Sequence, residues 1–102
     1  MRTFKYHNDP SHGWLAVKLD LLDSLDLVDK ITAYSYIKGK TVYLEEDLDC
    51  TTFLKEYKKM FGEFQQQSLY YNGRCPVRGY ESYSPKLARE ILSKCKKSKV
   101  FC

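Results

Sequence analysis

The chain has 102 residues, a net charge of +4 and a hydrophobic fraction of 43%, values that fit one small globular domain over residues 1–102. No apolar stretch approaches the length of a membrane span, and no basic start followed by an apolar run marks a secretory leader. We therefore expect an intracellular protein without membrane contact.

Two strands are predicted near the start of the chain, over residues 3–7 and 14–18, because apolar side chains alternate with polar ones in both segments. The segment 8–13 between them is rich in turn-forming residues. We expect an antiparallel hairpin in which Gly13 supplies backbone freedom and Trp14 packs at the sheet edge. A short helix over residues 20–28, capped by Asp20, follows.

The clearest structural prediction is a second hairpin, in which residues 32–37 and 42–45 flank a turn at Gly39-Lys40. A two-residue turn with glycine first suits the mirror-image type that joins antiparallel strands. The predicted register gives a core face with Ala33, Ser35, Ile37, Val42 and Leu44, and an opposite face with Tyr34, Tyr36, Lys38, Thr41, Tyr43 and Glu45.

The second half of the chain predicts two longer helices. One begins after Asp49, a favourable cap, and ends at Phe61 before Gly62; its apolar stripe is Cys50, Phe53, Leu54, Tyr57, Met60 and Phe61. The other begins with the Ser84 cap and Pro85; its stripe is Leu87, Ala88, Ile91, Leu92 and Cys95. Between them we expect a weak edge strand over 68–71 and an ordered loop over 75–80.

These elements predict an α+β fold: a single antiparallel sheet of two hairpins, with two or three helices packed on one face. The four cysteines, at positions 50, 75, 95 and 102, form no Cys-x-x-Cys pair, so we expect reduced thiols and no zinc site. Cys50 and Cys95 are predicted to pack in the core, and Cys102 to be exposed.

The tyrosine-bearing face of the second hairpin is the better functional candidate. Tyr34, Tyr36 and Tyr43 could stack on bases while Lys38 and Lys40 hold phosphate. The same face could equally bind a protein, or be covered by a helix of the same chain. The basic second half of the chain could steer an acidic partner, or attract the acidic first half.

The histidines suggest a second, weaker candidate. His7, Asp9 and His12 are residue types that bind metals or transfer protons, but their spacing matches no known metal motif. A structural hairpin loop is the favoured interpretation. No nucleophile motif and no phosphate-binding glycine loop is present, so we expect no cofactor, no metal and no enzymatic activity.

The run from His7 to Val17, together with residues 29–31 and 40–47, resembles small uncharacterised proteins of phages and mobile elements. Those proteins carry a similar His-x-Asp-Pro-Gly-His-Gly-Trp-Leu-Ala-Val run, with glycine where this chain has Ser11. The resemblance covers about the first half of the chain and implies a phage accessory protein, a class that often inhibits host defence.

The expected function is therefore a non-enzymatic binding protein: a phage-encoded inhibitor of a bacterial defence system, of the anti-CRISPR or anti-restriction type. It would contact a host protein or nucleoprotein complex in the bacterial cytoplasm. The alternatives are direct nucleic-acid or nucleotide binding, and a small hydrolase that uses His7 and His12. The predicted binding residues are Tyr34, Tyr36, Lys38, Lys40, Tyr43, His7, His12 and Trp14.

Overall fold

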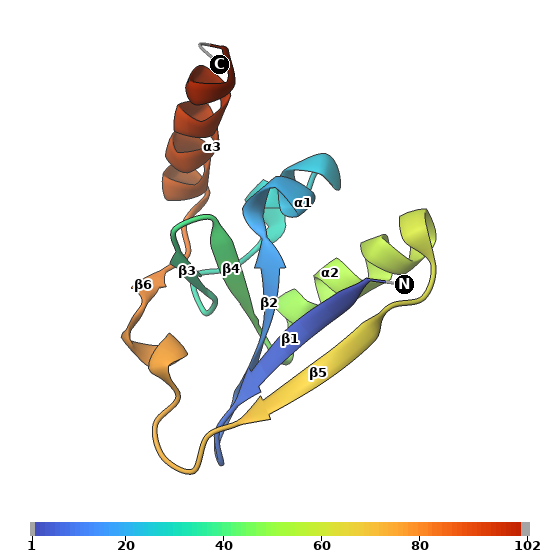
Figure 1. Ribbon diagram of the computed structural model, residues 1–102, viewed down its shortest axis with the longest axis vertical. Coiled ribbons are helices and arrows are strands. Elements are labelled where there is room, and N and C mark those ends of the chain that lie inside the picture. The colour runs from blue at the N-terminus through green and yellow to red at the C-terminus, as the bar shows by residue number, and fades with distance from the viewer. Residues whose placement is uncertain (1, 101–102) are drawn as a thin grey trace.

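The computed structural model describes residues 2–100, with side chains described as far as Lys94. Within this part of the chain, one mixed sheet has the strand order β5-β1-β2-β4-β3-β6 and is accompanied by three helices (Figure 1). The strands are β1 Thr3–Asn8, β2 Gly13–Lys18, β3 Tyr36–Lys38, β4 Thr41–Glu45, β5 Gln65–Tyr70 and β6 Glu81–Ser82. The helices are α1 Leu19–Ser24, α2 Asp49–Phe61 and α3 Pro85–Val100, with short 3-10 turns η1 Val28–Lys30 and η2 Pro76–Gly79. The predicted α+β class is confirmed.

The prediction of an all-antiparallel sheet of two hairpins is wrong. Both hairpins form, but β5 pairs with β1 in parallel, from Thr3 opposite Gln65 to Asn8 opposite Tyr70. The reason is α2, which carries the chain from β4 to the far edge of the sheet so that β5 runs in the same direction as β1 (Figure 1). Residues 65–67 are all glutamine, so this part of the strand lacks the alternation of apolar and polar side chains by which a strand is predicted from sequence.

The second hairpin has the predicted register at its turn, where Ile37 lies opposite Val42 and Gly39 has a positive φ of 60°. The predicted strand over 32–37 is too long, however, because β3 begins only at Tyr36. The preceding residues bend away, so that Ala33 is exposed rather than in the core, and the Ser35 hydroxyl accepts a hydrogen bond from the Glu45 amide at 3.0 Å.

The main core lies between one sheet face and the helices. Its buried members from the sheet are Phe4, Leu15, Val17, Ile37, Val42 and Leu44, and those from the helices include Leu22, Phe53, Tyr57 and Ala88. Cys50 is buried there as predicted, and the side chains of Cys95 and Cys102 lie outside the described residues. Met60 and Phe61 are 66% and 56% exposed, so their predicted place in the α2 core stripe is wrong. No helix of the described residues is long and apolar enough to cross a membrane.

Of the three predicted helix caps, Ser84 forms and Asp20 and Asp49 do not. Ser84 caps α3 as expected, because its hydroxyl accepts the Leu87 amide at 3.1 Å. Asp20 lies inside the first turn of α1 and makes no capping contact. Asp49 does not cap α2 either: its buried carboxylate accepts hydrogen bonds from the Thr32 amide at 3.1 Å and the Thr32 hydroxyl at 2.7 Å. A side chain from the end of β4 takes its place.

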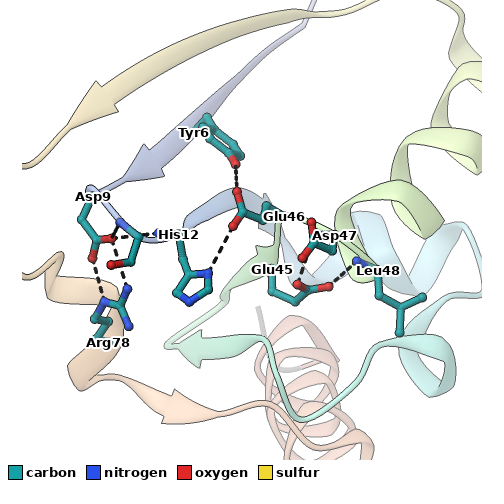
Figure 2. A network of polar contacts seen from close by, with 9 residues as sticks. Tyr6, Asp9, His12, Glu45, Glu46, Asp47, Leu48 and Arg78 are labelled. Carbon is teal, nitrogen blue, oxygen red and sulfur yellow. Dashed lines mark hydrogen bonds and ion pairs between the residues drawn. The ribbon is translucent and has the colours of Figure 1, made fainter.

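That side chain is Glu45, whose carboxylate accepts the amide hydrogens of Asp47 and Leu48 at the start of α2 (Figure 2). It also accepts the amide hydrogen of Asp49 at 2.9 Å. Burial alone would raise the pKa of Glu45, but these three amides outweigh it and hold the pKa below its usual value. The amides of a first helical turn have no partner within the helix, so this carboxylate stabilises the start of α2.

Replacing Glu45 by alanine is expected to lower the free energy of unfolding by about 1 kcal/mol near neutral pH, the usual effect of losing a helix cap. Because the pKa is lowered in the folded protein, this stabilisation is present above the ordinary carboxyl pKa and is lost as pH falls below it. Urea unfolding at pH 7 and below pH 4 checks this. A difference between wild type and variant that does not shrink in acid would contradict the capping role.

Candidate functional site

The sheet has a second face, on the side opposite the main core. Since side chains alternate along a strand, the registers assign each residue to a face. The second sheet face carries Gln65, Gln67 and Leu69 of β5, Thr3, Lys5 and His7 of β1, Trp14, Ala16 and Lys18 of β2, Thr41, Tyr43 and Glu45 of β4, and Tyr36 and Lys38 of β3.

One half of this face is covered by residues 71–80, here called the covering segment, which connects β5 at one edge of the sheet to β6 at the other (Figure 1). Its Cys75 and Val77 form a small second core with Trp14, against which Tyr36, Tyr43, Tyr71 and Tyr80 pack. Trp14 is only 3% exposed and belongs to an interior strand, so the prediction that it packs at the sheet edge is wrong. The predicted ordered loop over 75–80 is thus a lid on the second sheet face.

An ion pair between Asp9 and Arg78 attaches the covering segment to the first hairpin (Figure 2). The buried Asp9 carboxylate accepts the amides of Ser11 and His12 at 2.9 and 3.0 Å within its own turn. It also accepts the Cys75 amide at 3.2 Å and Arg78 Nε at 2.7 Å from the covering segment. The Arg78 guanidinium, 5.1 Å from the Trp14 ring, is the main reason that the pKa of Asp9 lies far below its usual range.

The two histidines bond to different partners. His7 Nδ1 lies 3.0 Å from the Tyr71 hydroxyl, while His12 Nδ1 lies 3.2 Å from Glu46 Oε1. Glu46 also accepts the Tyr6 hydroxyl at 3.3 Å, so it joins the hairpin loop to β1 (Figure 2). Burial, with a smaller contribution from Lys5, lowers the pKa of His7. Among the described residues, no group of three or more metal-ligating side chains forms at this loop or elsewhere.

Gly13 is required for space rather than for backbone freedom. The φ angle of Gly13 is not positive. The hairpin turn before it is closed by the Asp9 amide, which donates to the His12 carbonyl at 2.9 Å. A Cβ atom on residue 13 would lie 2.1 Å from the Tyr6 hydroxyl oxygen and 2.4 Å from ring atom Cζ. The prediction that Gly13 supplies backbone freedom is wrong, because the Tyr6 ring occupies the space that a side chain at position 13 would need.

The other half of the second sheet face is open and forms a groove of about 420 Å³. We call it the open groove; it is lined by Arg2, Thr3, Phe4, Lys5, His7, Ala16, Val17, Lys18, Thr41 and Tyr43. Lys5 and Lys18 are exposed on this face, and Lys38 lies on the same face in the row of Lys18 and Thr41. Arg2 is also exposed at the end of the groove, where its guanidinium lies 5.5 Å from the Phe4 ring centre. No acidic side chain lines the groove, and no ion pair of the described residues involves these four cations.

The predicted binding residues divide between two places. His7 and Tyr43 line the open groove, and Lys38 lies beside it with its ammonium 4.6 Å from the Tyr80 ring centre. A smaller cavity of about 220 Å³, here called the aromatic cleft, contains the other four predicted aromatic and histidine side chains: His12, Trp14, Tyr34 and Tyr36. Lys40 is exposed in the hairpin turn and lines neither.

No helix of the described residues covers the three hairpin tyrosines, each of which is at least partly exposed. Tyr34 is 77% exposed, and Tyr36 and Tyr43 are half-buried by the covering segment rather than by a helix. Their role in binding stays a prediction. Arg2, Lys5 and Lys18 were missed, although the Thr3-Lys5-His7 alternation already indicates a polar strand face.

Comparison with protein-family models, curated proteins and solved structures finds no match to this chain. Function is therefore inferred from the site itself, from the chemistry of the open groove and the aromatic cleft.

Proposed function

We propose that this protein is a non-enzymatic binding protein whose open groove binds the sugar-phosphate backbone of single-stranded nucleic acid. The observation that carries the proposal is the set of three cations, Lys5, Lys18 and Lys38, on one sheet face, with Arg2 lining the end of a groove that no carboxylate of the described residues lines. Unpaired cations on one surface attract a polyanion and gain from releasing its counterions.

The side chains that line the groove favour a single strand. Its floor is the small side chain of Ala16 beside the half-buried ring of Tyr43, and His7 lies 5.5 Å from that ring. A sheet with accessible aromatic rings lets unpaired bases stack while neighbouring cations hold phosphates. Lys18 and Lys38 are separated by β4, a distance of about 10 Å at ordinary strand spacing, so one strand of nucleic acid can reach both.

Removing two of these charges is expected to weaken binding selectively. In the variant Lys5→Gln/Lys18→Gln, affinity for a short fluorescent single-stranded DNA or RNA should fall by about tenfold or more at low salt. The slope of log affinity against log salt should decrease by about 0.7 for each lost phosphate contact. Fluorescence anisotropy at several salt concentrations measures both quantities.

The matched control is Lys55→Gln/Lys59→Gln, which removes the same net charge from exposed positions of α2. It should leave affinity within about twofold of wild type, because only general attraction changes. Equal losses in the two variants would argue against the open groove. Absence of binding by the wild type at low salt would refute nucleic-acid binding and favour the second candidate.

The second candidate is protein contact through the aromatic cleft, as expected for a phage-encoded inhibitor of a bacterial defence nuclease. The observation that favours it is Tyr34, which is 77% exposed at the mouth of a cleft with Tyr36 and His12. Tyrosine is enriched in protein interfaces and among the residues that contribute most of their binding energy. The hydrolase alternative gains no support from the geometry, because His7 and His12 bond to different partners.

A further inference from the structure

The outer edge of the sheet at β5 is open. On one side β5 pairs with β1 along its whole length, and no element of the described residues lies on its other side (Figure 1). All of its residues except Leu69 are exposed. A strand in this position presents unpaired amide and carbonyl groups to whatever reaches it.

The free groups can be assigned to residues. The Gln65 amide donates to the Arg2 carbonyl, and the Tyr71 amide to the Asn8 carbonyl, each at 2.8 Å. In a parallel ladder every second residue faces the neighbouring strand, so Gln65, Gln67 and Leu69 face β1. The backbone groups of Gln66, Ser68 and Tyr70 therefore point outward.

Nothing in β5 protects this edge. Natural sheets guard their edges with proline, charged side chains, bulges or very short strands. The sequence Gln-Gln-Gln-Ser-Leu-Tyr has no proline and no charge over six residues. The opposite edge of the sheet, β6, is by contrast only two residues long.

We propose that two copies of this chain pair through β5, antiparallel, about a two-fold axis at Ser68. In that register Ser68 lies opposite itself and Gln66 lies opposite Tyr70 of the other copy. All three outward-facing residues then meet in hydrogen-bonded pairs, as an antiparallel ladder requires. An uncharged strand can pair with its own copy without placing like charges opposite each other.

Apolar side chains at the two ends of the strand favour a second copy as the occupant. Tyr70 at one end is 63% exposed, and Phe61, which precedes the other end, is 56% exposed and lies 5.1 Å from the Tyr57 ring. Phe64 lies beside the same ring, at 5.9 Å. Antiparallel pairing makes Tyr70 the diagonal neighbour of Phe64 of the other copy, and the symmetry repeats this contact.

Pairing would also join the two second sheet faces on one side of a continuous sheet, because the local two-fold axis of an antiparallel pair is perpendicular to the sheet. The two open grooves would then form one longer cationic surface. This consequence for binding rests on the proposed function, whereas the pairing itself does not.

The test is sedimentation velocity of the full chain over a wide concentration range. Wild type should show a reversible monomer–dimer equilibrium. Ser68→Pro removes an outward amide without touching the β1 ladder and should weaken dimerisation by about tenfold or more, since one bond is lost in each copy. Ser68→Ala, which keeps the amide, should dimerise like wild type.

Tyr70→Lys provides a second variant, because this exposed side chain can be changed without loss of core packing. It should also weaken dimerisation by about tenfold or more, and circular dichroism should show both variants folded. A wild type that stays monomeric at the highest concentration would overturn the proposal. So would a dimer that neither Ser68→Pro nor Tyr70→Lys weakens. Binding of nucleic acid by a monomeric wild type would refute the pairing and leave the proposed function intact.

Discussion

Asp9→Asn is expected to lower the melting temperature by roughly 10 °C or more, because the substitution breaks the attachment of the covering segment. Both carboxylate oxygens of Asp9 accept hydrogen bonds from Arg78. One of them also accepts the amides of its own turn, and the other also accepts the Cys75 amide. The NH₂ group of an asparagine cannot accept a hydrogen bond. Whichever carboxylate oxygen it replaced, it would therefore point at N–H donors that lose their acceptor. Arg78 would also lose its charged partner next to the Trp14 ring.

The same variant should loosen the second core. Trp14 is the only tryptophan and is almost fully buried in the second core, so its fluorescence reports on the packing of that core. In Asp9→Asn we expect red-shifted emission and faster acrylamide quenching at temperatures below the transition. Asp29→Asn is the control, because it breaks an ion pair with Arg89 in which both side chains are exposed. Exposed ion pairs contribute little to stability, so this variant should melt close to wild type.

The effect of Asp9→Asn should depend on pH in a defined direction. The pKa of Asp9 is lowered in the folded protein, so its stabilisation is fully present above the ordinary carboxyl pKa of about 4. The difference between wild type and variant should stay constant from neutral pH to about that value and shrink only in stronger acid. A variant that melts within a degree or two of wild type at pH 7 would contradict the role assigned to Asp9.

Gly13→Ala is expected to lower the free energy of unfolding by about 2 kcal/mol, the usual range for overpacking. The new Cβ would overlap Tyr6 atoms at 2.1, 2.4 and 2.6 Å, so the ring would have to leave its position and its hydrogen bond to Glu46. Gly73→Ala is the matched control, since nothing lies within 4 Å of its Cβ position and its φ is not positive. Urea denaturation of both variants gives the comparison.

A double-mutant cycle identifies the cause. Tyr6→Ala removes the obstructing ring and has its own cost, because Tyr6 packs against the main core. If the overlap is the cause, Gly13→Ala should cost little in the Tyr6→Ala background, giving a coupling energy close to the full effect. Additive losses would show that Gly13 acts through the backbone instead, as the sequence alone suggested.

Local chemistry determined much of the secondary structure from the sequence alone. The turn at Gly39-Lys40 follows from the conformational freedom of glycine, and the start of α3 follows from Ser84 and Pro85. The alternating pattern of residues 3–7 likewise predicts a strand with one apolar face. Each of these signals acts between residues a few positions apart, so each can be read directly.

Contacts between distant residues were decided only by the tertiary structure. Asp49 and Asp9 both look like ordinary turn or cap residues, yet Asp49 is bonded to Thr32 and Asp9 to Arg78, 69 residues away. The parallel position of β5 depends on where α2 returns the chain to the sheet, which the Gln-rich pattern does not encode.

The candidate site likewise contains some residues that the sequence indicates and others that only the tertiary structure brings together. His7, Lys38 and Tyr43 could be selected from the sequence, because their residue types and strand positions suggest a binding face. Lys5, His7 and Lys18 of the first hairpin could not be joined to Lys38 and Tyr43 of the second, because β2 and β4 become neighbours only through the order of strands in the sheet. A strand pattern assigns a side chain to a face, whereas its neighbours on that face come from hydrogen-bonded pairing between segments far apart in the chain.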